Sequence, residues 1–168
     1  RDVYLIPEDR VQESMLPGWS ISWTASLPFL KSITTRSFLN FGKEHRLGQD
    51  LITEFGVVAG GDEQEDDSLS GGNQQKVVVG RWLHGTPRVL LLDEPFRGVD
   101  IGARRDLSRK AREVACTGVG VVVLTSDIDE VLEVADRIVV LVDGEVRFET
   151  YSSQTNRDQI VARMSEVA

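Results

Sequence analysis

Two short stretches of the sequence combine residue types that could act on a phosphorylated ligand. The Ser-Gly-Gly sequence at 70–72 precedes an apolar-faced segment with helical spacing. The first N–H groups of a helix have no internal partner, so they can bind an anion. Asp93 and Glu94 follow the apolar run 89–92, which is typical of a buried strand that carries carboxylates to the edge of a sheet. Backbone amides suit phosphate and carboxylates suit a divalent cation, so together they indicate nucleoside triphosphate chemistry.

Length and composition are those of an ordinary globular chain. Its 168 residues are 40% hydrophobic and 27% charged, enough for one domain that buries about 70% of its unfolded surface. The net charge of −8 argues against a nucleic-acid-binding face, because phosphate backbones are held by clusters of lysine and arginine. The single cysteine, Cys116, cannot form an internal disulfide, which favours a reducing compartment. No apolar run approaches the roughly 18 residues of a membrane span.

Apolar periodicity predicts an α/β fold that positions both stretches on a mostly parallel sheet. Buried strands are expected at 3–6, 89–92, 121–124 and 137–141, and Asp143-Gly144 predicts a hairpin turn into a strand at 145–150. Helices are expected at 73–84, 102–116 and 127–135, with a last helix starting near residue 155. In this order the glycines of 70–72 open a helix, and the two carboxylates end a strand.

The region from 11 to 60 is less regular and mainly helical. Apolar residues recur with helical spacing over 20–33, interrupted by Pro28, and over 44–55. Aromatic residues concentrate here: Trp19, Trp23, Phe29, Phe38 and Phe41. We interpret them as the core of a small helical subdomain. The alternative is a patch that faces a partner, which exposed aromatic side chains would favour.

An acidic run follows at 60–67. Such a run is usually a solvated loop, and its spacing matches no calcium-binding EF-hand. We therefore expect a loop rather than a cation site.

The stretches described so far resemble, in their order and spacing, the ATP-binding cassette ATPases of ABC transporters. Residues 69–72 are similar to the family signature, 89–94 to the Walker B strand with its catalytic carboxylate, 98–100 to the D-loop, 124–127 to the switch segment and 3–10 to the Q-loop strand. The resemblance implies a partial nucleotide-binding domain over 1–168. A helical subdomain would occupy about 15–65, and 1–14 with 66–168 would form the α/β core, which ends in a β-hairpin and a helix.

Three segments narrow the resemblance to one subgroup. Asn73-Gln74-Gln75-Lys76, Pro7-Glu8-Asp9-Arg10 and the segment 97–103 are similar to the second cassette of tandem ATPases that serve monosaccharide importers of the ribose/galactose/xylose type. The resemblance implies transmembrane permease subunits and a second cassette as partners, no nucleic acid, and a peripheral position on the cytoplasmic face of the inner (plasma) membrane. The helical subdomain would dock on the permease. The transported solute stays open, because solute choice belongs to other subunits.

The same resemblance implies ATP and Mg²⁺ as cofactors and gives roles to four residues. Asp93 would hold Mg²⁺ through water, and Glu8 is the second candidate metal ligand. Glu94 would orient or deprotonate the attacking water. Ser126 occupies the switch position and is the second candidate catalytic residue. The structural alternative for Glu94 is a salt-bridged carboxylate at a strand end.

The signature residues would act on a nucleotide that the opposite cassette holds. Ser70, Gly71, Gly72 and Asn73 would contact its γ-phosphate, and Asp100 would couple the two sites across the dimer. The structural alternatives are an ordinary helix cap and turn at 70–72 and a helix cap at Asp100.

Three departures from the family pattern limit this interpretation. No Gly-x-x-x-x-Gly-Lys-Ser/Thr loop occurs in the chain, which begins at Arg1 rather than methionine, so we expect the native polypeptide to start earlier. Ser126 replaces the switch histidine, and Glu8 replaces the usual glutamine. We expect this chain alone neither to bind ATP tightly nor to hydrolyse it. We also expect it to leave apolar sheet surface bare.

Two other functions remain open from the sequence. One is a non-catalytic regulatory or relic half-cassette that binds a partner without turnover. The other is a cassette ATPase of DNA repair, although the chain has neither long coiled-coil arms nor a basic surface.

Overall fold

The computed structural model describes residues 2–36, 38–83, 85 and 87–165. It divides into two compact units, Arg1–Leu124 and Thr125–Ala168, which are described separately below. None of the described helices is long and apolar enough to cross a membrane.

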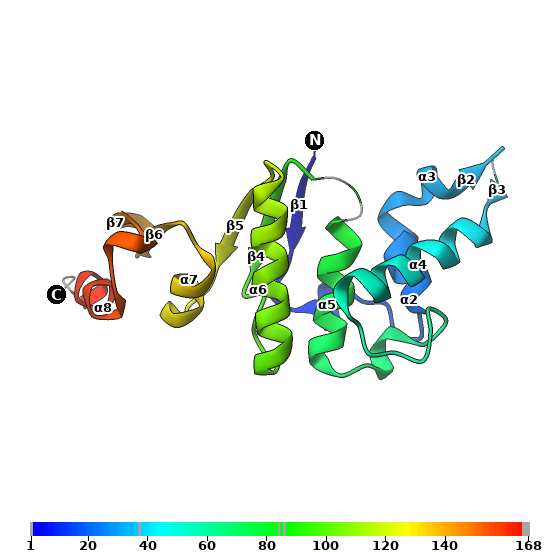
Figure 1. Ribbon diagram of the computed structural model, residues 1–168, viewed down its shortest axis with the longest axis horizontal. Coiled ribbons are helices and arrows are strands. Elements are labelled where there is room, and N and C mark those ends of the chain that lie inside the picture. Colours follow the sequence, from blue (N-terminus) through cyan, green and yellow to red (C-terminus); the bar gives the residue numbers. More distant parts are fainter. Residues whose placement is uncertain (1, 37, 84, 86, 166–168) are drawn as a thin grey trace. The chain divides into compact units, whose positions relative to one another are not determined.

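The first unit is built on a three-stranded parallel sheet in the order β1-β4-β5 (Figure 1). Its strands are β1 (Val3–Ile6), β4 (Val89–Asp93) and β5 (Gly120–Leu124). Ile6 is level with Leu92 and Asp93 with Leu124, so the carboxyl ends of all three strands meet at one edge. The predicted strands at 3–6, 89–92 and 121–124 and the parallel arrangement are confirmed.

Two long helices cover one face of this sheet. The first, α5 (Gly71–Leu83), contacts β1 and α6, and α6 (Ile101–Cys116) contacts β5. The side chains of Ile6, Leu90 and Leu92 are at most 3% exposed beneath them. This packing places the start of α5 and the start of α6 close to each other, at the edge of the sheet where the strands have their carboxyl ends.

The opposite face of the sheet carries exposed apolar side chains. Residues at alternate positions of a strand point to opposite faces, and the register puts Leu5, Leu91 and Val122 in one row. On that face Val3, Leu5, Val122 and Leu124 are 56%, 52%, 47% and 45% exposed. The prediction that 121–124 is a buried strand is therefore only half right. The expected bare apolar surface is confirmed. Parallel sheets are normally covered on both faces, so we expect other protein surface to pack on this exposed face.

Self-association of the chain is the expected consequence of this bare face. A few hundred Å² of exposed apolar surface is worth several kcal/mol when it is covered, at about 25 cal/mol per Å². Leu5→Thr combined with Val122→Thr places β-branched residues with high strand propensity at both positions and should shift the chain toward monomer in sedimentation velocity. Val58→Thr is the matched control, because Val58 is 78% exposed outside the sheet. Equal association of all three proteins would contradict the prediction.

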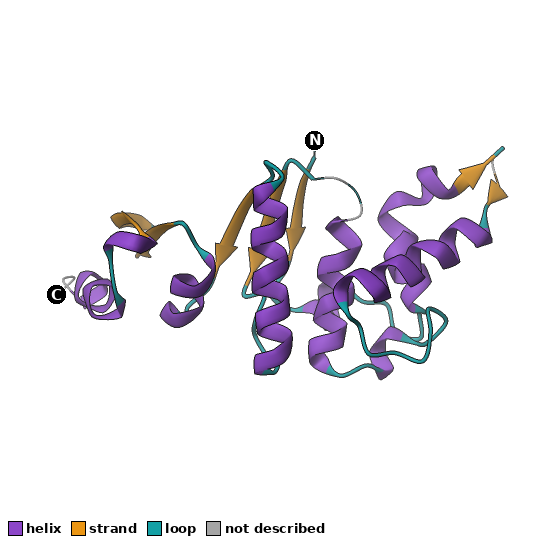
Figure 2. Ribbon diagram, in the orientation of Figure 1, coloured by secondary structure: helices purple, strands orange, loops and turns teal. Residues whose placement is uncertain are grey.

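The helical part of the first unit joins β1 to α5 (Figure 2). It contains α1 (Arg10–Glu13), α2 (Ile21–Ser26), α3 (Leu30–Ile33), α4 (Phe41–Phe55), a short hairpin of β2 (Thr34–Thr35) and β3 (Phe38–Leu39), and 3₁₀ turns at Leu27–Phe29 and Asp66–Ser68. The first of these turns contains Pro28, where the sequence predicted an interruption. A side chain at Gly48 would place its Cβ 2.9 Å from the Ser22 Cα, so α2 and α4 cross in close contact.

Three of the five aromatic residues expected in the core of this part are exposed, so the prediction is wrong for them. Trp23, Phe38 and Phe41 are 49%, 79% and 65% exposed, whereas Trp19 and Phe29 are half-buried. The buried apolar residues of this part are Met15, Ile21, Ala25, Ile33, Leu47, Leu51, Phe55 and Val57. Helical periodicity identifies residues that share a face, but it does not say which face is covered. The exposure favours the alternative of a patch that faces a partner.

The acidic segment 60–67 is a loop as predicted, but two of its carboxylates are not solvated. Asp66 is fully buried and accepts a hydrogen bond from the Thr24 hydroxyl. Asp62 is 7% exposed; its Oδ2 lies 2.7 Å from His45 Nδ1, and its Oδ1 accepts from Gln49 at 3.2 Å. These carboxylates hold the loop to α2 and α4.

The His45–Asp62 pair predicts a pH dependence of stability. The hydrogen bond with Asp62 raises the pKa of His45 above its ordinary 6.5. Burial acts to raise the pKa of Asp62, but hydrogen bonds with His45 and Gln49 outweigh it and bring that pKa below 3.8. The His45 contribution is complete below pH 6.5 and lost as pH rises through its raised pKa. The Asp62 contribution is complete above pH 3.8 and lost on acidification.

The thermal midpoint should therefore be higher near pH 6 than near pH 8 in the native chain. His45→Gln should remove most of that difference, and a scan of both proteins at the two pH values checks it. An unchanged difference in the variant would assign the pH dependence to other groups.

The second unit packs a β-hairpin against two helices. Its elements are α7 (Ile128–Val134), β6 (Arg137–Val142), β7 (Glu145–Tyr151), a 3₁₀ turn at Ser152–Gln154 and α8 (Arg157–Ser165). Asp143 and Gly144 both have positive φ, which is the geometry of the predicted hairpin turn. Ile138, Val140 and Ile160 form the core. The last helix begins at Arg157, one residue later than a Thr155 cap predicts, because the Asn156 side chain accepts from the Gln159 N–H and caps it.

Candidate functional site

Asp93 and Glu94 lie where β4 leaves the sheet. Asp93 is the last residue of the strand, and the Glu94 N–H donates to the Leu124 carbonyl oxygen at 2.8 Å. Glu94 has a φ of 43°, a left-handed conformation that costs a residue with a side chain about 1–2 kcal/mol. Its carbonyl accepts from the Arg97 N–H at 3.1 Å and closes the turn. Strained backbone of this kind persists where the surrounding structure enforces it, often at functional sites.

Glu8 joins this turn from the neighbouring strand. Ile6 pairs with Leu92, so the chain leaves β1 beside the end of β4, and the Glu8 carboxylate forms an ion pair with the Arg97 guanidinium. Among the residues that the structure describes, no group of three histidine, cysteine or acidic side chains could hold a metal ion. The Glu8 carboxylate is engaged by an arginine, and Asp93 is the last residue of the neighbouring strand.

The signature segment begins α5. The Ser70 carbonyl accepts from the Gln74 N–H at 2.9 Å, and the Ser70 hydroxyl accepts from Asn73 Nδ2 at 3.0 Å. The Asn73 side-chain oxygen accepts from the Val58 N–H at 2.9 Å. Asn73 therefore ties the start of α5 to the loop after α4, while Ser70 stays exposed.

The two signature glycines lie too close to the next segment to carry side chains. A Cβ on Gly71 would lie 2.9 Å from the Gly98 carbonyl oxygen, and one on Gly72 would lie 2.8 Å from the Ala103 Cβ and 3.1 Å from an Asp100 carboxylate oxygen. The signature segment therefore packs directly on the 98–100 turn and on the start of α6, which the sequence places far away.

Asp100 caps α6. Its side chain accepts from the Ala103 N–H at 2.9 Å, so the helix-cap alternative describes what it does in this chain. Because the same carboxylate borders Gly72, the cap also sets the distance between α6 and the signature.

Arg10 is a residue of the site that the sequence interpretation missed. It lies in α1, and its guanidinium donates to the Arg97 carbonyl and to the Gln74 side chain. The sequence offered one indication of this role: Arg10 ends the segment Pro7-Glu8-Asp9-Arg10, which as a whole resembles the corresponding segment of the importer ATPases.

Ser126 belongs to the second unit and is described only within it. It is exposed and precedes Asp127, whose side chain caps α7 by accepting from the N–H groups of Asp129 and Glu130. The neighbouring Thr125 hydroxyl donates to the Glu130 carboxylate at 2.7 Å.

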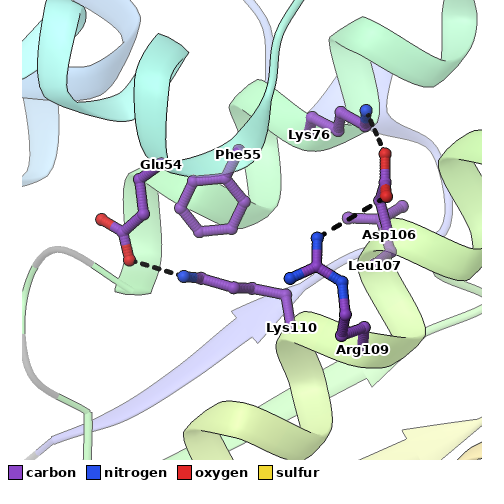
Figure 3. Close-up of a pocket in the computed structure, with 7 residues that line it drawn as sticks. All are labelled: Glu54, Phe55, Lys76, Asp106, Leu107, Arg109 and Lys110. Carbon is purple, nitrogen blue, oxygen red and sulfur yellow. Dashed lines mark hydrogen bonds and ion pairs between the residues drawn. The ribbon is translucent and has the colours of Figure 1, made fainter.

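A shallow pocket between α4, α5 and α6 is filled by paired charges rather than open to a ligand (Figure 3). Lys76 Nζ lies 2.7 Å from the Asp106 carboxylate and 3.2 Å from the Gly56 carbonyl, and Lys110 Nζ lies 2.8 Å from Glu54. The hydrogen bond with Lys76 lowers the pKa of Asp106. These contacts lock the helix that carries the signature to its two neighbours.

Comparison with known proteins gives three findings. Residues 5–97 match the ABC transporter family. The chain is 35% identical over 144 residues to the ribose import ATP-binding protein RbsA of Shouchella clausii, covering 86% of this chain and 29% of that protein. It is 34% identical over 165 residues to the ribose import ATP-binding protein RbsA 2 of Rhizobium meliloti, covering 98% and 32%. The chain thus spans about a third of the length of these relatives.

A solved structure shares the fold. The dimeric, post-hydrolysis structure of the ATP-binding cassette MJ0796 bound to ADP and Pi superposes with a TM-score of 0.74 at 22% identity, covering 90% of this chain and 63% of that one. The expected fold class, an α/β ATPase domain with a mostly parallel sheet, helices and a closing hairpin, is confirmed.

Proposed function

This chain belongs to the ABC transporter family, and from that membership we propose that it is part of an ATP-hydrolysing subunit that powers import of a monosaccharide or a related solute. The relatives named as ribose import ATP-binding proteins support the solute class. The observation that carries the proposal is the pair Asp93-Glu94 at the carboxyl edge of the sheet, with Glu94 held at positive φ between β5 and Arg97.

In this proposal Glu94 accepts the proton of the attacking water. A carboxylate placed at the reacting oxygen contributes as a general base and orients the water. The hydrogen bond from its N–H to Leu124 and the turn closed by Arg97 hold the backbone that carries it, so the base is placed by the sheet rather than by a free loop.

Asp93 is the residue that would hold Mg²⁺, since a carboxylate oxygen at a strand end is the ligand type that this ion prefers. Mg²⁺, when bound, neutralises charge on the phosphate oxygens. Glu8 acts through Arg97 in this proposal, because its carboxylate is already paired with that guanidinium.

The signature segment serves a phosphate held by a second cassette. The N–H groups at the start of α5 and the exposed Ser70 hydroxyl supply donors for an anion, and Asn73 orients the segment through Val58. Asp100 borders Gly72, so a change at the signature reaches the start of α6 directly. The proposed assembly contains two cassettes and transmembrane permease subunits, and this chain lies at the cytoplasmic face of the membrane.

The experiment that tests the proposal is ATP hydrolysis and solute uptake by the complete protein with its permease in sealed vesicles. ATP-dependent uptake of a monosaccharide supports the proposal. Binding of nucleotide without turnover or uptake overturns it in favour of a non-catalytic half-cassette. That second function is favoured by one observation: Ser126 stands where the family has a histidine, and serine cannot carry a proton near neutral pH.

The helical part, about residues 15–65, is the proposed docking surface for the permease. Phe38 and Phe41 are the most exposed of its aromatic side chains, at 79% and 65%, and large exposed apolar side chains mark interaction sites. Phe38→Ser with Phe41→Ser should release the complete protein from membranes that contain its permease, while ATP turnover by the detached protein persists. Val58→Ser is the control. Retention of the double variant in the membrane pellet would place the docking surface elsewhere.

A further inference from the structure

Arg10 lies where three segments of the site meet. Its Nη1 donates to the Arg97 carbonyl oxygen at 3.1 Å, and its Nε donates to the Gln74 side-chain oxygen at 3.4 Å. Gln74 belongs to the start of α5, and Arg97 closes the turn that begins at Glu94. One guanidinium therefore bonds both the helix of the signature and the turn of the proposed base.

The packing around this guanidinium is close on both sides. A Cβ on Gly71 would lie 2.7 Å from Arg10 Nη2, and one on Gly98 would lie 3.7 Å from Nη1 and Nη2. The two glycines thus leave space that the guanidinium fills, beside the direct approach of Gly71 to the Gly98 carbonyl oxygen.

Charge holds the same turn from a second direction. Glu8 forms an ion pair with the Arg97 side chain, whereas Arg10 bonds the Arg97 backbone. Two residues of the short segment after β1 therefore bind Arg97, Glu8 through its side chain and Arg10 through its carbonyl oxygen. A planar guanidinium can serve two acceptors at fixed angles, which a lysine ammonium on a flexible stem cannot do.

We infer that Arg10 is a positioning residue that couples the signature segment, residues 70–74, to the turn that carries Glu94. The inference rests on the proposed function, which assigns those two segments to opposite sites of a cassette pair. The bonds of Arg10 run to protein groups, the Arg97 carbonyl and the Gln74 side chain, so its role here is to position other residues. Because Arg10 bonds both segments, the turn that carries Glu94 also moves when the nucleotide of the partner cassette displaces the signature segment.

The test compares Arg10→Gln, Arg10→Lys and the control Arg88→Gln in the complete protein. Arg88 is an exposed residue just before β4, at the opposite end of that strand from Asp93. We expect Arg10→Gln to lower kcat about tenfold, because roughly one charged hydrogen bond is lost in the transition state. The KM for ATP should change less than about twofold. Arg10→Lys should not restore kcat, and the thermal midpoint of Arg10→Gln should match that of Arg88→Gln.

Two results would overturn the inference. One is a kcat of Arg10→Gln equal to that of Arg88→Gln; the other is a parallel loss of kcat, ATP affinity and thermal stability, which indicates a merely structural role. A wild-type protein without turnover would refute the proposed function instead. In that case hydrogen exchange still decides: Arg10→Gln should deprotect the backbone of 70–74 and of 94–98 together, and deprotection of neither or of only one segment refutes the coupling.

Discussion

Glu94→Gln should slow ATP hydrolysis at the site that Glu94 serves by about 100-fold or more, since a general base contributes on the order of 10²–10⁴-fold. Glutamine has the shape of glutamate but cannot accept the proton of the attacking water. The backbone that places the side chain depends on the Leu124 and Arg97 hydrogen bonds, which the substitution leaves in place. The loss should therefore appear in kcat with little change in KM or thermal stability.

Phosphate release by the complete protein measures this effect, with the other cassette inactivated so that one site is counted. Glu65→Gln makes the same chemical change at an exposed loop position and should leave turnover intact. Turnover of Glu94→Gln within about threefold of wild type would exclude Glu94 as the base, because that is far below the contribution of a general base. The half-cassette that binds without turnover would then be the better description.

Arg81→Met should destabilise the chain by about 1–3 kcal/mol, the cost of leaving a buried polar group without its hydrogen-bond partner. The Arg81 side chain is 5% exposed, and its Nη1 donates to the Ser14 carbonyl at 2.7 Å. Asp66, which is fully buried, is the carboxylate that it attracts. Methionine fills a similar volume but leaves the Ser14 carbonyl without its donor and Asp66 without its cation.

The loss should depend on pH. Burial raises the pKa of Asp66, and the attraction of Arg81 opposes that rise. Without the arginine the pKa of Asp66 in the folded protein rises further. The free energy of unfolding then falls as pH rises through that pKa, and it is retained at lower pH, where Asp66 is protonated. Urea unfolding followed by tryptophan fluorescence should show a larger loss at about pH 7.5 than at about pH 4.5. Asp66→Asn added to Arg81→Met should recover part of the loss; equal losses at both pH values would show that the pair does not interact.

Local sequence determined the elements and the motifs of this protein. The strands predicted at 3–6 and 89–92 are β1 (Val3–Ile6) and β4 (Val89–Asp93), and the turn predicted at Asp143-Gly144 has the expected positive φ values. These features depend on alternation, turn residues and caps within a few positions of each other, which a single sequence displays in full. The order and spacing of the signature and Walker B segments were sufficient for the family assignment for the same reason.

Only the tertiary structure decided which faces of the helices and strands are covered and which contacts hold the site together. The exposure of Phe38 and Phe41 and the burial of Asp66 depend on what packs against each face, and periodicity carries no information about that. Arg10 bonds a carbonyl 87 residues away in the chain, and neither residue type nor spacing marks such a contact. Long-range contacts arise from the summed packing of the sheet and its helices, so the residues that couple the site emerge only when the chain is folded.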